Sequence, residues 1–227
     1  MSDETCWTLI EAAGAGDAGA REDFAARYLP AVRAYLSARW GQTPLSGHVE
    51  DALQEVFVEC LKDGGALERA ERDSSAGFRA YLYGVARNVA QRVEERRARE
   101  ADRAEDASFH PERRPSDDPS LSAAFDRAFA IGMLRAALRS HRASARDGGE
   151  RAVARYELLR QRFGEGKSIA EIAREQQADA AFLHHEYAVA RNEFHGHLRQ
   201  VVATHHPGAA PGEIERECEH LVDLVDD

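Results

Sequence analysis

The feature that most constrains this chain is the stretch 78–103, which reads as one long amphipathic helix. Its apolar residues recur at helical spacing, as Phe78, Tyr81, Leu82, Val85, Val89 and Val93. Another face carries a polar row, made of Asn88, Arg92, Arg96, Arg99 and Arg103. Guanidinium groups in a row suit a phosphate backbone. Because Glu94, Glu95, Glu100 and Asp102 are interleaved, the stretch alone favours a solvated face of Glu–Arg pairs.

The composition predicts an all-α protein. Ala and Arg dominate the 227 residues, and runs of β-branched residues are few. The length allows one large domain or two small ones.

The acidic charge lies at the two ends of the chain. The total is −10, of which residues 1–76 contribute −7 and residues 207–227 contribute −6, whereas residues 77–206 carry +3. A charge of +3 on the middle segment is small for a protein that binds DNA without a partner. A protein delivered to DNA by a larger partner needs less charge of its own.

The cysteines and the hydropathy predict a cytoplasmic protein with no membrane association. Cys6, Cys60 and Cys218 are far apart and lack CxxC spacing, which is typical of a reducing compartment, and Cys6 and Cys60 are expected to be buried. No apolar run approaches membrane-spanning length, and the first residues do not resemble a signal peptide.

Periodicity and breakers predict two helical domains joined by a Pro-rich linker. The expected domains are 1–104 and 120–206, with the linker at 105–119 and an acidic helical tail at 207–227. Pro30 should kink or split the second helix. The expected helices are 5–13, 17–40, 48–62, 78–103, 120–142, 150–163, 169–176, 180–204 and 213–225, with loops at 63–77 and 143–149.

The second domain contains a helix-turn-helix pattern. Ser168 and Glu171 form a capping box for a short helix, and Gln177 begins a three-residue turn before a long helix from Ala180. We expect Ile172 and Ala173 to pack under Leu183 and Tyr187. The alternative is an ordinary αα-hairpin in a bundle.

In this order, the elements resemble a group 4 (extracytoplasmic-function) sigma factor of bacterial RNA polymerase. The resemblance covers most of residues 5–204. Three stretches carry it: Asp51-Ala-Leu-Gln-Glu-Val-Phe-Val-Glu-Cys-Leu61 and Phe78-Arg-Ala-Tyr-Leu-Tyr-Gly-Val-Ala-Arg-Asn88, similar to region two, and Ser168-Ile-Ala-Glu-Ile-Ala173 through Ala190-Arg191, similar to region four.

The resemblance implies two partners, core RNA polymerase and promoter DNA, and leaves open an anti-sigma factor. The polymerase-binding residues would be Asp51, Gln54, Glu55 and Glu59, and loop 63–77 would capture an unstacked base of the −10 element. The DNA-binding residues on the −10 side would be Arg79, Tyr83, Arg87, Asn88, Arg92 and Arg96. On the −35 side they would be Ala180, His184, His185, Arg191 and Asn192.

The chain departs from the family in the last of these helices. His184, His185 and Glu186 stand where the family usually places Lys, Ser or Arg, and neutral histidine gives little charge. The acidic helix 213–225 also lies beyond the family pattern and could be regulatory, a partner site or packing.

Other chemistries are less well supported. Histidines are grouped in three pairs, at 184/185, 195/197 and 205/206. No i, i+4 pair with a third ligand is evident, so we expect no metal site. We find no sequence pattern of an enzyme or a cofactor site. The patterns sought were a Gly-rich phosphate-binding loop, a Ser/His/Asp catalytic arrangement and paired catalytic carboxylates. The alternative functions are a stand-alone helix-turn-helix regulator or adaptor that binds DNA without polymerase, and a protein-interaction module.

Overall fold

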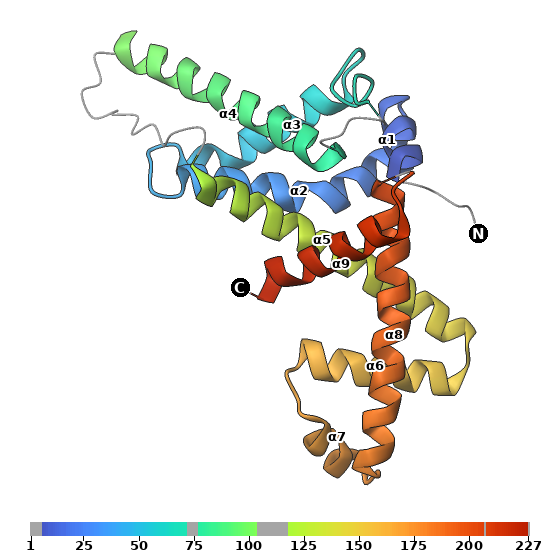
Figure 1. Cartoon of the computed structure of the whole chain (residues 1–227). Helices are drawn as coiled ribbons and strands as arrows, with labels where there is room; N and C mark the ends of the chain where they lie inside the picture. Colours follow the sequence, from blue (N-terminus) through green and yellow to red (C-terminus); the bar gives the residue numbers. More distant parts are fainter. Residues whose placement is uncertain (1–5, 72–76, 104–117, 207, 227) are drawn as a thin grey trace. The chain divides into compact units, whose positions relative to one another are not determined.

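In the computed structural model the described residues are 6–71, 77–103, 118–206 and 208–226, and these contain helices and turns but no strand. The prediction of an all-α protein is therefore confirmed for this part of the chain (Figure 1). The elements are α1 (Cys6–Gly14), α2 (Ala18–Trp40), the 3-10 turn η1 (Ser46–His48), α3 (Val49–Leu61), α4 (Gly77–Arg103), α5 (Pro119–Asp147), α6 (Glu150–Gly164), α7 (Ile169–Gln176), α8 (Ala180–His205) and α9 (Pro211–Asp226). No helix among the described residues has both the length and the apolar character needed to cross a bilayer.

The contacts divide the chain into two compact units. The first comprises Met1–Gly132 with Thr204–Ala209 and Glu219–Asp227, and the second comprises Met133–Ala203 with Ala210–Cys218. The division thus falls inside α5, near the end of α8 and inside α9. Most of the predicted linker 105–119 lies outside the described residues, so the predicted domain boundary stays a prediction.

The first unit is built around an aromatic core between α1, α2 and α4. The predicted apolar residues of α2 are all buried, from Phe24 and Tyr28 to Leu36. Tyr28 lies 5.2 Å from Phe78 of α4 between ring centroids, and Phe24 lies 4.8 Å from Tyr28. Cys6 is also in this core, 2.8 Å from the Tyr28 hydroxyl, and its burial raises the pKa of the thiol to about 11.

Two local predictions for the helices need correction. Of the two outcomes predicted for Pro30, the split is wrong, since α2 continues through it to Trp40, and the kink stays a prediction. Residues 143–147 belong to α5 rather than to a loop, because Ala and Arg favour a helix there and only Gly149, with φ of 85°, requires a break.

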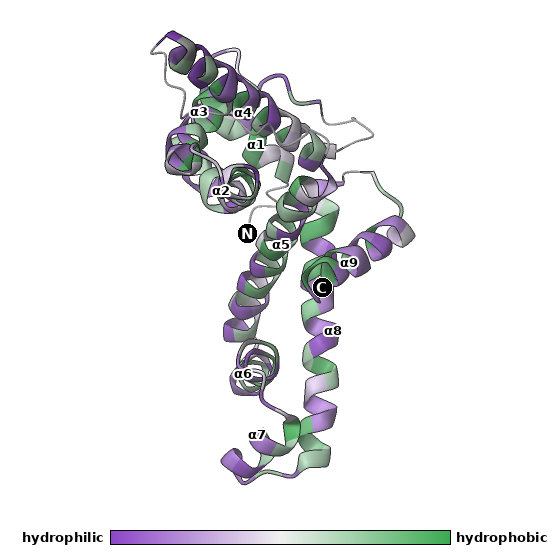
Figure 2. Cartoon of the chain, turned by 90° about the vertical axis from the view of Figure 1, so that its left-hand side faces the viewer, coloured by the Kyte–Doolittle hydropathy of each residue, from purple (hydrophilic) through white to green (hydrophobic). Residues whose placement is uncertain are grey.

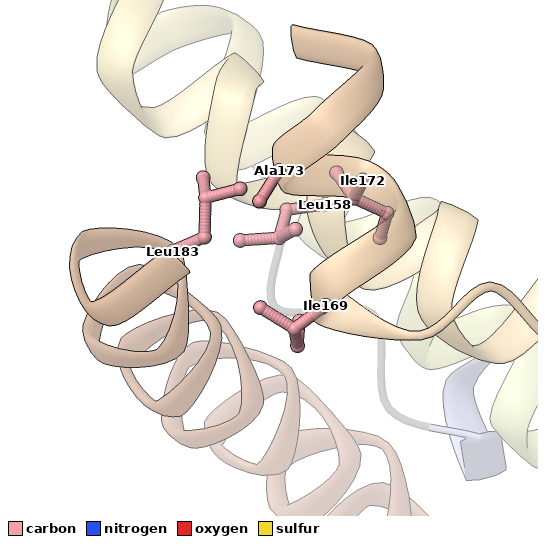
Figure 3. Close-up of a cluster of buried hydrophobic side chains, with 5 residues drawn as sticks. All are labelled: Leu158, Ile169, Ile172, Ala173 and Leu183. Carbon is pink, nitrogen blue, oxygen red and sulfur yellow. The ribbon is translucent and has the colours of Figure 1, made fainter. Parts of the chain in front are cut away.

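The second unit contains the short helix, turn and long helix that the sequence predicts. Ser168 Oγ accepts from the Glu171 amide at 3.2 Å, and Glu171 accepts from the Ser168 amide at 2.7 Å, which completes the capping box of α7. The chain leaves α7 at Gln177 with φ of 52°. The predicted packing is confirmed: Ile169, Ile172, Ala173 and Leu183 form one buried cluster with Leu158 of α6, and Tyr187 packs against it (Figure 3).

Candidate nucleic-acid interface

Helix α3 presents a polar face that is open to solvent. Its buried side is made of Ala52, Leu53, Val56 and Cys60, as its helical periodicity predicts. On the opposite side Asp51 and Gln54 are exposed. Val58, one turn further along the helix, is 63% exposed. A single exposed apolar side chain is ordinary on a protein surface, so the polar groups of Asp51 and Gln54 are what distinguish this face.

The polar row of α4 lies directly against this acidic face. Arg92 Nη2 is 3.3 Å from Glu59 Oε2, and Arg96 Nη2 is 2.5 Å from Glu55 Oε1. The second pair raises the pKa of the Arg96 guanidinium. Residues of both helices line a groove of about 500 Å³, and the predicted polymerase-binding and DNA-binding residues therefore meet in it.

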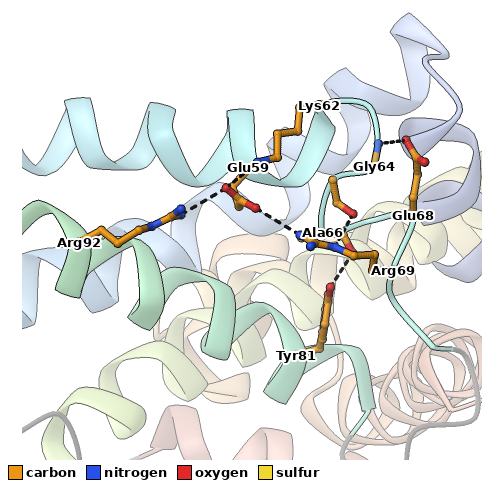
Figure 4. Close-up of polar contacts among 9 residues, drawn as sticks. Glu59, Lys62, Gly64, Ala66, Glu68, Arg69, Tyr81 and Arg92 are labelled. Atoms are coloured by element: carbon orange, nitrogen blue, oxygen red, sulfur yellow. Dashed lines mark hydrogen bonds and ion pairs between the residues drawn. The ribbon is translucent and has the colours of Figure 1, made fainter.

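Glu59 is the centre of the polar contacts at the end of α3 (Figure 4). It accepts from Lys62 at 3.0 Å and from Arg69 at 3.2 Å, in addition to Arg92. Lys62 and then Arg92 hold the pKa of this carboxyl below its ordinary value, although partial desolvation opposes them. Three cations on one carboxylate fix the loop and α4 to the end of α3.

The loop after α3 is folded back onto that helix. The Ala66 amide donates to the Glu59 carbonyl at 2.8 Å, and the Tyr81 hydroxyl of α4 donates to the Ala66 carbonyl at 2.7 Å. Gly65 permits this return, because a Cβ there would lie 2.5 Å from the Lys62 carbonyl. Part of the predicted base-capturing loop 63–77, residues 72–76, lies outside the described residues.

A second, larger groove lies between this loop and α4. Its volume is about 850 Å³, and Asn88 and Arg92 contribute to its wall. The other lining residues are Glu59, Ala66, Arg69, Ala80, Tyr81, Gly84, Val85, Gln91 and Glu95.

The remaining predicted residues of the −10 side are engaged inside the first unit. Arg79 forms a 3.0 Å ion pair with Asp126 of α5. The ring of Tyr83 packs edge-on against Tyr35 and Phe125, with centroids at 5.2 and 5.4 Å. Arg87 is half-buried, so Asn88, Arg92 and Arg96 are the exposed members of this predicted set.

In the second unit, the first turns of α8 expose most of the predicted −35 residues. Ala180, His184 and His185 are exposed, and so are Arg191 and Asn192 further along the helix. The Arg191 guanidinium lies 6.0 Å from the centre of the Tyr187 ring, within cation–π range.

Glu186 does not belong to this exposed surface, contrary to its expected place among the DNA-facing residues. It is 4% exposed and accepts from Arg151 Nη2 at 2.7 Å and from Arg151 Nε at 3.1 Å. The Arg151 contact holds the pKa of Glu186 below its ordinary value. Arg155 of α6 likewise pairs with Glu193 of α8 at 2.6 Å. No local signal in the sequence marks either pair.

The buried or half-buried histidines of the predicted pairs have different partners. His195 lies 3.2 Å from Glu215, His197 is 2.9 Å from the Ser140 hydroxyl, and His205 is 3.0 Å from the Tyr28 hydroxyl. Among the described residues, no cluster of His, Cys, Asp or Glu is arranged to hold a metal ion.

Comparison of the chain with protein-family models, with curated proteins and with solved structures gives no match.

Proposed function

We propose that this chain is a sigma factor of the group 4 type, which binds core RNA polymerase and directs it to promoter DNA. One observation carries the proposal. The three stretches that resemble the family are helical, and each leaves some polar residues of its motif exposed: Asp51 and Gln54 on α3, Asn88 on α4, and His184 and Arg191 on α8.

The face of α3 suits a basic partner surface. Asp51 and Gln54 have their polar groups in solvent, and Val58 adds apolar area that the partner would bury. Glu55 and Glu59 are less available to a partner, because both are bound to arginines of α4. Asp51 and Gln54 are thus the best residues with which to test polymerase binding.

The exposed part of α4 suits the strand of the −10 element. Asn88 can pair with a base edge, and Arg92 and Arg96 can contact phosphates once they leave Glu59 and Glu55. The first turns of α8 suit the major groove of the −35 element, since Leu183 and Tyr187 anchor the helix from behind.

The test is co-purification with core polymerase and promoter-dependent transcription in vitro. The variant Asp51→Arg with Gln54→Arg should lose association with core enzyme and should not initiate. The matched control is Glu22→Arg with Ala26→Arg, which makes the same charge change on an exposed face of α2 and should bind normally.

Two results would contradict the proposal. One is that the wild-type chain fails to associate with core polymerase. The other is that it binds promoter DNA as a dimer and does not need polymerase, which would favour a stand-alone regulator.

A further inference from the structure

The second half of α5 carries a row of four exposed arginines, Arg135, Arg139, Arg142 and Arg146. At 100° per residue they fall within about 60° of the helix surface, and the row is about 16 Å long. The opposite side of the helix is buried, through Met133, Ala137, His141 and Ala145. Figure 2 shows the hydrophilic edge along this part of α5.

The guanidinium groups of this row have no acidic partner among the described residues. Within the described residues, no carboxylate lies within ion-pair distance of any of the four. This differs from Arg92, Arg96 and Arg151, which are each paired with a glutamate. The neighbours in the row are three or four residues apart, a spacing at which like charges destabilise a helix. A bound polyanion would remove this repulsion.

The surroundings of the row decide which polyanion it suits. A single strand needs aromatic side chains on which bases stack, and none lies in the row. A membrane surface needs a free apolar face on the same helix, but that face of α5 is already buried inside the unit. A straight row of planar guanidiniums matches the phosphates along one strand of a duplex.

We propose that Arg135, Arg139, Arg142 and Arg146 form a binding site for the phosphate backbone of duplex DNA. The helix-turn-helix arrangement of α7 and α8 belongs to the same compact unit. The row would therefore add sequence-independent affinity to any sequence-specific DNA binding by α7 and α8. The site lies on α5 alone, and DNA binding there does not require polymerase.

The test uses the full chain without polymerase and a labelled 30-bp DNA duplex of arbitrary sequence. Binding is measured from 50 to 300 mM KCl, for the wild type and for a variant with all four arginines changed to Gln. Each lost phosphate contact reduces the slope of log K against log salt by about 0.9, so the variant should lose about three to four slope units. At 100 mM salt its affinity should fall at least tenfold.

The matched control removes four cations that are already paired: Arg33→Gln, Lys62→Gln, Arg160→Gln and Arg199→Gln. It changes the net charge equally and should keep the slope within one unit. A further variant, with Lys at the four row positions, keeps the charge and should keep most of the slope. Circular dichroism checks that all the variants are folded.

Several outcomes would overturn the site. They are no binding of the duplex by the wild-type chain, an equal loss of slope in the control, loss of the slope in the Lys variant, and better competition by single-stranded DNA, duplex RNA or anionic vesicles. Association of the Gln variant with core polymerase should remain normal, so failure of this site and failure of the proposed function can be distinguished.

Discussion

Glu94 offers the sharpest test of how the first unit is held together. Although it lies among the charged residues of α4, it is 8% exposed. It accepts from Arg39 Nε at 2.5 Å, from Arg39 Nη2 at 2.9 Å and from Trp40 Nε1 at 2.8 Å. Burial disfavours the charged guanidinium, but hydrogen bonds to Glu94 and Tyr35 hold the pKa of Arg39 above its ordinary value.

Removing Glu94 should therefore be costly. In Glu94→Ala, Arg39 is left as a buried charge with only the Tyr35 hydroxyl at 3.2 Å, and Trp40 Nε1 loses its acceptor. Breaking a buried pair in this way costs about 3–5 kcal/mol. The double variant Arg39→Met with Glu94→Leu removes both charges and leaves the indole N–H unpaired, which costs about 1–3 kcal/mol. The single variant should thus be less stable than the double.

The assay is urea unfolding followed by tryptophan fluorescence. Both tryptophans, Trp7 and Trp40, are buried in the first unit, so the signal reports on that unit. With a slope of about 2 kcal/mol per M, a loss of about 4 kcal/mol lowers the midpoint by about 2 M. Glu95→Ala, at the adjacent exposed position, should change stability by less than about 0.5 kcal/mol. A cost below about 1 kcal/mol for Glu94→Ala, or a double variant less stable than the single, would refute the reasoning.

Three further predictions concern single positions. Gly65→Ala should cost about 2 kcal/mol or more in the same fluorescence assay, because its Cβ would clash with three carbonyls, whereas Gly84→Ala meets no atom and should stabilise α4 by about 0.5–1 kcal/mol. Gln177→Gly should stabilise the second unit by about 0.5–1 kcal/mol in thermal unfolding followed by circular dichroism, since the residue has a φ of 52°, and a loss of stability would contradict the backbone argument. Burial, and then His141, lower the pKa of His197, and Glu193 opposes this effect. As the pH falls, the unfolded state therefore binds a proton at this histidine before the folded state does. The stability that His197 contributes should therefore be complete above about pH 6.5 and fall below it, and His197→Gln should reduce this dependence in thermal unfolding between pH 5 and 8.

The helices of this protein follow from local sequence. Apolar periodicity predicts the buried residues of α2 and most of those of α4, where Tyr81 and Val85 are only half-buried. The capping box and turn at Ser168 and Gln177 predict where α7 begins and ends. These signals are readable because each depends on residues within a few positions of one another. The packing of Ile172 under Leu183 was predictable for the same reason, since a three-residue turn leaves few ways to join the two helices.

The charged residues were decided by tertiary structure. Nothing near Glu94 or Glu186 in the sequence distinguishes them from solvated carboxylates, and their partners lie 55 and 35 residues away. The same holds for Arg92 and Arg96, whose glutamates come from another helix, whereas the arginines of α5 remain without acidic partners among the described residues. Periodicity tells which face of a helix carries charge. Only the packing of one helix against another determines whether that charge is neutralised, because a desolvated ion pair requires both partners at one point in space.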